Sequence, residues 1–350
     1  MPQYDALLYP TNQSKTPIKS MKKLIFLFLS ITLLCACKNG NTAVTDAEPQ
    51  LLGPVFNEDS ALAFCAKQCE FGPRNMNTEA HEQCAQWIID KFKEYGCEVS
   101  TQKVDIKGWD GTMLHSTNII ASINPTATQR ILFCAHWDSR PWADNDPDES
   151  NHHTPIIAAN DAASGVGVML EMARVIHPDS IAIGIDFVCF DAEDYGAPSW
   201  SGIDDENSWA LGAQYFALKY KEKEMNMFAN SEWQAAVLLD MVGGQNAKFH
   251  QEGLSKHYAQ SIIDDVWQAA SDAGYGSFFP YSTGGYITDD HKPLNEAGIP
   301  TIDIIPYYPD CEASAFGPTW HTISDDMNHL DKGTLKAVGQ TLIQYLFSIQ

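Results

Sequence analysis

Two stretches of the chain hold residue types that metal-dependent chemistry uses. An apolar run, 131–135, leads into His136 and Asp138, and Asn160-Asp161 precedes a run of small residues. Side chains two residues apart at a strand end point to the same side. An imidazole at a strand end and a carboxylate at a helix start suit a metal site at the carboxyl edge of an open sheet. Taken singly, Asp161 could instead be a helix N-cap and His136 a satisfied loop histidine.

Other predicted strands also end in potential ligands: 181–190 before Glu193-Asp194, 235–239 before Asp240, and 301–305, whose following loop leads to His321. Carboxylates and imidazoles without thiolates suit zinc in a catalytic site, where three protein ligands leave one position open. Neighbouring carboxylates such as Glu193 and Asp194 can diverge, one to a metal and the other to a substrate as general base. The alternative is a solvated acidic loop, which is what we expect of Asp204-Asp205-Glu206.

The elements that must position these residues alternate along the chain. Helices are expected at 60–70, 77–95, after Asp161, and at 209–220, 255–273 and 334–347; strands are expected at 97–106, 117–123, 131–135, 181–190, 235–239 and 301–305. This alternation predicts an α/β fold of three layers, α/β/α, around a central mixed, mostly parallel sheet. The 350 residues are 44% apolar, which is enough for one large domain once a leader is removed.

The net charge of the chain favours some classes of binding partner over others. The first 36 residues hold four lysines and one aspartate, so the remainder carries 18 basic and 44 acidic residues and a formal charge of −26. Such a surface argues against nucleic acid, whose binding depends on neutralising phosphates. It would attract cationic ligands such as the free amino terminus of a peptide, although solubility alone could also explain it.

The amino-terminal segment resembles an export signal. Met21-Lys22-Lys23 precedes thirteen uncharged residues, too few to span a bilayer comfortably, and Leu34-Cys35-Ala36-Cys37 resembles a bacterial lipobox. We therefore predict a signal region at 1–36 with the true start at Met21, a lipid-anchored polar tether at 37–55, and a single catalytic domain at 56–350. The protein would be an exported lipoprotein on the periplasmic side of a membrane. Ordinary cleavage, or a start at Met1 with different processing, is the alternative.

The nine cysteines do not form a metal-binding pattern. No CxxC pair occurs, and Cys84, Cys134 and Cys189 lie inside apolar patterns, where they are expected to be small core residues. An exported chain could form a disulfide, but the spacing indicates no pair. A zinc site built from thiolates is not expected.

The order of the candidate residues resembles that of a known superfamily. The candidate residues follow one another in the order seen in the zinc aminopeptidases: His136-x-Asp138, Asn160-Asp161, Glu193-Asp194, Asp240 and His321-Thr322. Within that superfamily the chain is most similar to the zinc-dependent glutaminyl-peptide cyclotransferases, or glutaminyl cyclases. The segments that carry this likeness are Leu238-Leu-Asp240, Thr283-Gly-Gly-Tyr-Ile-Thr-Asp289-Asp290-His291-Lys-Pro293 and Trp320-His321-Thr322-Ile-Ser-Asp325-Asp326. The resemblance covers about 56–350.

The resemblance implies a role for individual residues. It implies one Zn²⁺ on Asp161, Asp194 and His321, with Glu193 as general acid/base, Asp240 and Asp289 in its hydrogen-bond network, and Trp320 and Trp200 as pocket walls. His136 and Asp138 would belong to a second metal or to the surroundings of the first. Two positions depart from animal-type cyclases, which commonly have Glu at Asp194 and His at Asp303. The shorter carboxylate requires the metal or the backbone to shift, and Asp303 adds an acid near the site.

The activity implied is cyclisation of the amino-terminal glutamine of peptides or proteins to pyroglutamate, with release of ammonia. The expected protein is a monomer that contacts a membrane only through its lipid. One alternative is a two-zinc aminopeptidase in which His136 and Asp240 hold a second ion and Asp161 bridges. A noncatalytic binding module of the same fold is a further alternative, but it should lack a central residue, and Asp161, Glu193, Asp194 and His321 are all present.

Overall fold

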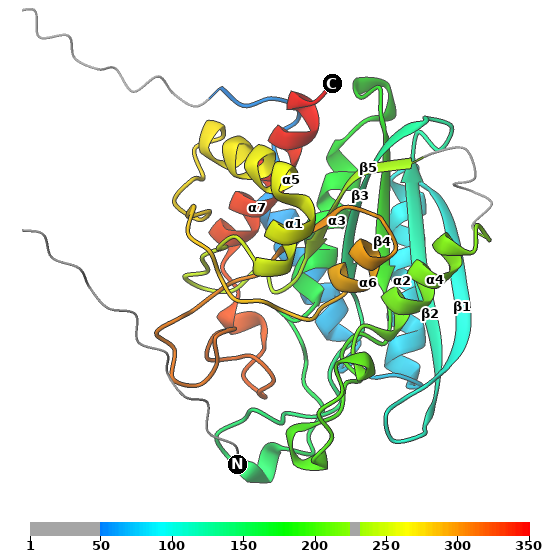
Figure 1. The fold of residues 1–350 in the computed structure, drawn as a ribbon, viewed down its shortest axis with the longest axis vertical. Coiled ribbons are helices and arrows are strands. Elements are labelled where there is room, and N and C mark those ends of the chain that lie inside the picture. The colour runs from blue at the N-terminus through cyan, green and yellow to red at the C-terminus, as the bar shows by residue number, and fades with distance from the viewer. Residues whose placement is uncertain (1–49, 225–231) are drawn as a thin grey trace, which may run out of the picture. The chain divides into compact units, whose positions relative to one another are not determined.

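The computed structural model describes residues 50–224 and 232–350, in which two helices and two strands come first and strands then alternate with helices (Figure 1). The predicted signal region, and the predicted tether up to residue 49, lie outside these residues. The helices are α1 (Glu58–Glu70), α2 (Glu79–Glu94), α3 (Ala163–Val175), α4 (Leu211–Lys221), α5 (Gly253–Asp272), α6 (His291–Glu296) and α7 (Lys332–Ser348). The strands are β1 (Glu98–Lys107), β2 (Met113–Ile123), β3 (Gln129–His136), β4 (Gly184–Phe190), β5 (Glu232–Leu239) and β6 (Thr301–Ile304).

The strands form one mixed sheet in the order β1-β2-β4-β3-β5-β6. Strands β4, β3, β5 and β6 run parallel to one another, whereas β2 pairs antiparallel with both β1 and β4. The carboxyl ends of the four parallel strands therefore lie at one edge of the sheet. This arrangement confirms the predicted mixed sheet and gives the polar residues after these strands a common location.

Helices cover both faces of the sheet, as the alternation of strand side chains requires. On β3, Ile131, Phe133 and Ala135 pack in one core with residues of α1, α2, α3, α5 and α7. Leu132 and Cys134 point to the opposite face and pack with residues of α4 and α6. Because β3 is central and buried on both sides, its sequence is continuously apolar rather than alternating. The predicted three-layer α/β/α fold is confirmed.

Local sequence determines where the helices begin. Thr78 caps α2 and accepts a hydrogen bond from the backbone N–H of His81, as its position before an amphipathic run predicted. The short helix α6 was not predicted, because its six residues include Pro293 and show too little periodicity. Cys84, Cys134 and Cys189 are buried core residues, as expected, and the described cysteines are all free. In the described part of the chain, no helix has both the length and the apolar character needed to cross a bilayer.

Candidate metal centre and active-site pocket

Three adjacent strands bring acidic and imidazole groups to one edge of the sheet. β3 ends at His136, Asp194 follows β4, and Asp240 follows β5 directly. Asp161 lies just before α3, and His321 lies in the long loop between β6 and α7. The residues at the ends of these strands are far apart in the sequence, but they become neighbours in space because β4, β3 and β5 are adjacent and parallel.

Asp161, Asp194 and His321 form one potential metal centre. Their ligand atoms all lie within 4.8 Å of one another, and all three residues are buried. Nε2 of His321 is 3.3 Å from Oδ1 of Asp194 and 3.8 Å from Oδ2 of Asp161. The second carboxylate oxygen of Asp194, Oδ2, is buried and has no hydrogen-bond partner among the described residues. A buried carboxylate atom without a donor fits a cation, and two carboxylates with one imidazole suit zinc.

A second group of three shares Asp161 with the first. His136, Asp161 and Asp240 also place their ligand atoms within 4.8 Å of one another. Nε2 of His136 is 2.8 Å from Oδ1 of Asp161 and 3.5 Å from Oδ1 of Asp240. Burial alone would lower the pKa of His136, but hydrogen bonds with Asp138, Asp161 and Asp240 raise it well above its usual value. Burial, with the carboxylate of Asp161, raises the pKa of Asp240 to about 8.

The structure contradicts the simpler explanation for Asp161, whereas His136 is hydrogen-bonded within the protein but lies on a strand and not in a loop. The N-cap of α3 is Ala162, without a side-chain capping bond, so Asp161 does not cap the helix. Instead, Asp325 accepts hydrogen bonds from the backbone N–H groups of Asn160 and Asp161, which holds this segment at the sheet edge. His136 is the last residue of β3 and is buried between carboxylates.

Asp138 fixes the turn that separates Glu193 from Asp194. Its two carboxylate oxygens accept hydrogen bonds from the backbone N–H groups of Glu193, at 3.2 Å, and Asp194, at 3.1 Å. Nδ1 of His136 lies 3.3 Å from the same carboxylate, so the predicted pairing of His136 and Asp138 on one side is confirmed. Glu193 lines the cavity, whereas Asp194 faces His321.

The environment of Glu193 favours its protonated form. Burial raises its pKa well above the usual value; His136 opposes this shift, and the carboxylates of Asp289 and Asp194 add to it. Oε2 of Glu193 lies 4.0 Å from Nε2 of His136. A carboxyl group with a raised pKa, open to a cavity beside a potential metal centre, can exchange protons with a bound substrate.

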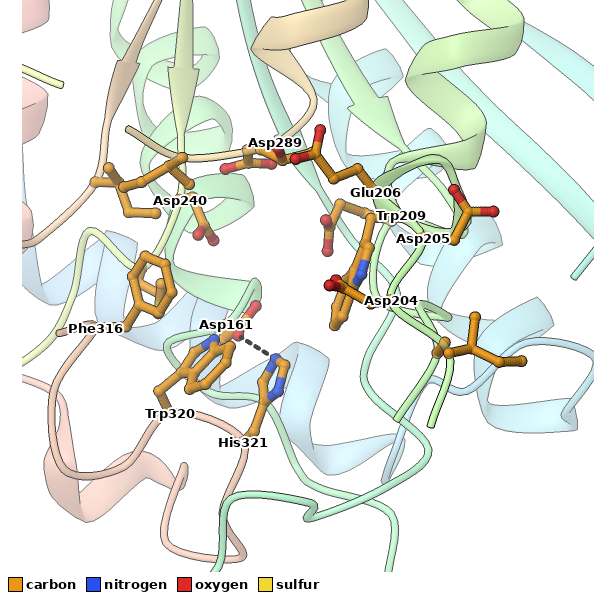
Figure 2. A pocket seen from close by; sticks show the side chains of 17 residues that line it. Asp161, Asp204, Asp205, Glu206, Trp209, Asp240, Asp289, Phe316, Trp320 and His321 are labelled. Atoms are coloured by element: carbon orange, nitrogen blue, oxygen red, sulfur yellow. Dashed lines mark ion pairs between the residues drawn. The ribbon is translucent and has the colours of Figure 1, made fainter. Parts of the chain in front are cut away.

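A cavity of about 320 Å³ opens onto these residues. Its inner surface includes Asp161, Glu193, Asp240, Asp289 and His321. Figure 2 shows Trp209 on one side and Phe316 with Asp240 on the other, with Trp320, His321 and Asp161 between them. Asp204, Asp205 and Glu206, expected as a solvated loop, are exposed and border the same cavity.

The aromatic wall contains Trp320, as expected, but Trp209 rather than Trp200. Trp200 is absent from the lining, is 41% exposed, and contacts the rings of Trp142, His152 and His153. Trp209 stacks on His321, with ring centroids 5.9 Å apart and an angle of 12°. The two tryptophans stand on one loop, and nothing in their local sequence indicates which of them turns inward.

Asp289 and Asp303 belong to a buried cluster beside the cavity. Asp289 lines the cavity, whereas Asp303, on β6, is not part of the lining. Ligand atoms of Asp289, His291 and Asp303 lie within 4.8 Å of one another, and Nε2 of His291 is 3.2 Å from Glu252. Burial, followed by the carboxylates of Asp289 and Asp240, raises the pKa of Asp303 well above its usual value. Sequence analysis did not single out Glu252 or a role for His291.

Comparison with known proteins shows to which family the chain is similar. The model of peptidase family M28 matches residues 118–346. A curated relative, the glutaminyl-peptide cyclotransferase of Gloydius blomhoffii, is 25% identical over 246 residues, which cover 65% of this chain and 63% of that protein. The match thus spans less than two thirds of the length of this curated relative.

Solved structures resemble the chain over nearly their whole length. A glutaminyl cyclase of Bacteroides thetaiotaomicron, solved with N-acetylhistamine bound, is 46% identical, with a TM-score of 0.80 over 85% of this chain and 99% of that one. A zinc-dependent exopeptidase of Parabacteroides distasonis is 44% identical, with a TM-score of 0.80 and the same coverage. Similar folds therefore occur in a glutaminyl cyclase and in an exopeptidase.

Proposed function

We propose that this chain, which belongs to peptidase family M28, converts the amino-terminal glutamine of peptides or proteins to pyroglutamate and releases ammonia. The observation that carries the proposal is that Glu193 lines one aromatic-walled cavity together with Asp161 and His321, which form a potential metal centre with Asp194. The likeness to a bacterial glutaminyl cyclase over 99% of its length supports the same activity. Offering the protein peptides that begin with glutamine or leucine tests it.

The metal proposed is one zinc ion on Asp161, Asp194 and His321. The donor set fits, since Oδ2 of Asp194 is buried without a hydrogen-bond donor among the described residues. Zinc bound there would polarise the γ-amide carbonyl and stabilise the negative charge that develops on its oxygen. The exopeptidase likeness, whose protein is described as zinc-dependent, supports the choice of metal.

The reaction forms one bond and breaks one. The α-amine nitrogen bonds to the γ-amide carbon of the same residue, and the bond from that carbon to the amide nitrogen breaks. Glu193 takes the proton that the amine must lose and passes it to the departing ammonia. An amino terminus has a pKa near 7.7–8.0, so at neutral pH it is often an ammonium that must first release one proton to solvent. The second proton, which the nitrogen loses as the new bond forms, is the one that Glu193 as a carboxylate transfers to the leaving nitrogen. The raised pKa of Glu193 suits a group that both accepts and returns a proton.

The cavity wall and the other carboxylates position the substrate. Asp289 and Asp240 line the cavity and can accept hydrogen bonds from the amine or the departing nitrogen. Trp209 and Trp320 enclose the side chain and favour the folded conformation that ring closure requires. Holding the reacting atoms close in this way supplies part of the rate enhancement by reducing the entropy lost on reaction.

A second candidate function is a two-zinc aminopeptidase. The observation that favours it is the group His136, Asp161 and Asp240, which shares Asp161 with the first group and could hold a second ion. Glu193 would then activate a metal-bound water. The activity test separates the two functions, because only the peptidase releases a free amino acid.

The proposal extends to location and partners. The lipobox-like sequence at Cys37 supports an exported lipoprotein with the catalytic domain on the periplasmic side of a membrane. Its partners would be peptides or proteins with amino-terminal glutamine, and the catalytic unit would act as a monomer. The acidic mouth formed by Asp204, Asp205 and Glu206 would attract the positively charged amino terminus of such a substrate.

A further inference from the structure

The polar insertion at 142–155 connects the two loops that form the site. Its backbone N–H at Asn145 donates to the carbonyl of His321 at 3.0 Å, and the Asn145 side chain donates to the carbonyl of Trp320 at 3.3 Å. On the other side, the backbone N–H of Ser199 donates to Asp144 at 3.1 Å. The insertion thus holds the His321 loop and the loop after Asp194 in fixed relation.

Asp144 and Arg140 form the centre of this connection. Arg140 donates two hydrogen bonds to Asp144, from Nε to Oδ1 at 2.6 Å and from Nη2 to Oδ2 at 2.7 Å. The Arg140 side chain is only 1% exposed and that of Asp144 7%. Such bidentate pairs have a defined geometry, unlike a mobile surface ion pair.

The pair contacts two of the three proposed zinc ligands. Oδ1 of Asp144 lies 3.3 Å from Nδ1 of His321, on the side of the ring away from Asp161 and Asp194. Nη1 of Arg140 lies 3.1 Å from the carbonyl of Asp194 and 3.4 Å from its Oδ1. A carboxylate at Nδ1 keeps the proton on that nitrogen, so Nε2 is free to bind a metal.

We infer that Asp144 is a positioning residue for His321 and that Arg140 connects it to Asp194, so that the insertion sets the metal affinity of the site. The inference rests on the zinc assignment proposed above, but not on which reaction the site performs. On this inference the insertion helps to build the metal site, and Asp144 is the acidic residue of 142–155 that contacts a metal ligand. A purely structural ion pair would support folding without affecting the metal.

The experiment measures zinc affinity in the full-length protein by competition with a coloured chelator. Asp144→Ala, which removes the acceptor from Nδ1, should weaken zinc binding by about 10- to 100-fold, the usual effect of losing such a partner. Asp144→Asn keeps an acceptor oxygen but not the charge that holds Arg140, and about a tenfold loss is expected. Asp148→Ala is the matched control, because Asp148 is exposed in the same insertion and bonds only within its own turn. It should bind zinc as the wild type does.

Two further measurements separate positioning from folding. Thermal unfolding of the zinc-free variants reports the structural contribution of the pair, and the visible spectrum of the Co²⁺-loaded protein reports metal geometry. The inference predicts an altered spectrum in both Asp144 variants and not in Asp148→Ala. If Asp144→Ala does not fold, Asp144→Asn carries the test.

The outcomes distinguish this inference from the proposed function. Folded Asp144 variants with wild-type zinc affinity and an unchanged cobalt spectrum would refute the positioning role and leave the zinc site standing. Wild-type protein that binds no zinc, or His321→Ala that binds it undiminished, would refute the zinc assignment and this inference with it.

Discussion

Trp209 and His321 lie with their rings nearly parallel, at 12°, and with centroids 5.9 Å apart. Trp320 also stacks on this imidazole, with ring centroids 3.7 Å apart and an angle of 22°. The proposed zinc ligand therefore contacts two aromatic rings that also line the cavity. This arrangement couples the shape of the substrate pocket to the orientation of the imidazole.

The two tryptophans of the 195–210 loop should differ in their effect on catalysis. Trp209→Phe shortens the cavity wall and removes a contact of His321, so we expect kcat/KM for a glutamine peptide to fall about tenfold, or about 1.4 kcal/mol. Trp200→Phe is the matched control, because Trp200 lies outside the cavity, and its kcat/KM should change less than twofold. A larger effect at Trp200 than at Trp209 would contradict the pocket described here.

Glu193 should be required for turnover but not for metal binding. Glu193→Gln keeps the size of the side chain and removes its ability to take a proton, so we expect kcat to fall by about 10²–10⁴-fold with zinc content unchanged. Steady-state kinetics and elemental analysis of the same sample measure both. The control is Glu94→Gln on the exposed face of α2, where activity should equal that of the wild type. Normal turnover in Glu193→Gln would remove Glu193 from the proposed role.

The part of the site that sequence predicts well is the part fixed by sheet topology. Potential ligands that follow apolar runs must meet at one edge once those runs are parallel neighbours, and His136, Asp194 and Asp240 do so. The three-layer fold follows from the same pattern, because strand and helix periodicities differ strongly. These features depend on local sequence and on a general rule of parallel sheets.

Features set by tertiary contacts were not predictable. Trp209 and Trp200 have similar local sequences, and the choice between them depends on packing against His321. Asp144 stands among several acidic residues of an insertion, and only its contacts with Arg140 and His321 distinguish it. Asp161 has the sequence position of an N-cap, but its carboxylate faces His136 instead.

Asp303 should make the protein less stable as pH rises. Its pKa is raised in the folded state, chiefly by burial, so folding takes up a proton between the unfolded value near 4 and the folded value. The free energy of unfolding therefore falls with increasing pH over that interval, by about 1.4 kcal/mol for each unit of pKa shift.

The corresponding variant is Asp303→Asn, which cannot ionise. The unfolding temperature of Asp303→Asn minus that of the wild type should be more positive at pH 8 than at pH 5. Thermal unfolding at a fixed zinc concentration measures this difference. Asp272→Asn, on the exposed side of α5, should show the same difference from wild type at both pH values. A difference for Asp303→Asn that is independent of pH would mean that this carboxyl group does not change its protonation on folding.

Cys37 should determine where the protein is found. If it is the acylated residue, Cys37→Ala should move the protein from the membrane pellet to the soluble fraction of expressing cells. Cys35→Ala keeps the lipobox-like pattern and should remain in the pellet. Retention of Cys37→Ala in the membrane fraction would show that another feature anchors the chain.

The most direct test of the central claim uses purified protein of measured zinc content and two peptides that differ only in their first residue. With glutamine first, we predict one ammonia released for each pyroglutamyl peptide formed, loss of this activity on zinc removal, and its return when zinc is restored. With leucine first, we predict no reaction. Release of the free leading amino acid from either peptide would contradict the cyclase and identify an aminopeptidase, with His136 and Asp240 on a second zinc.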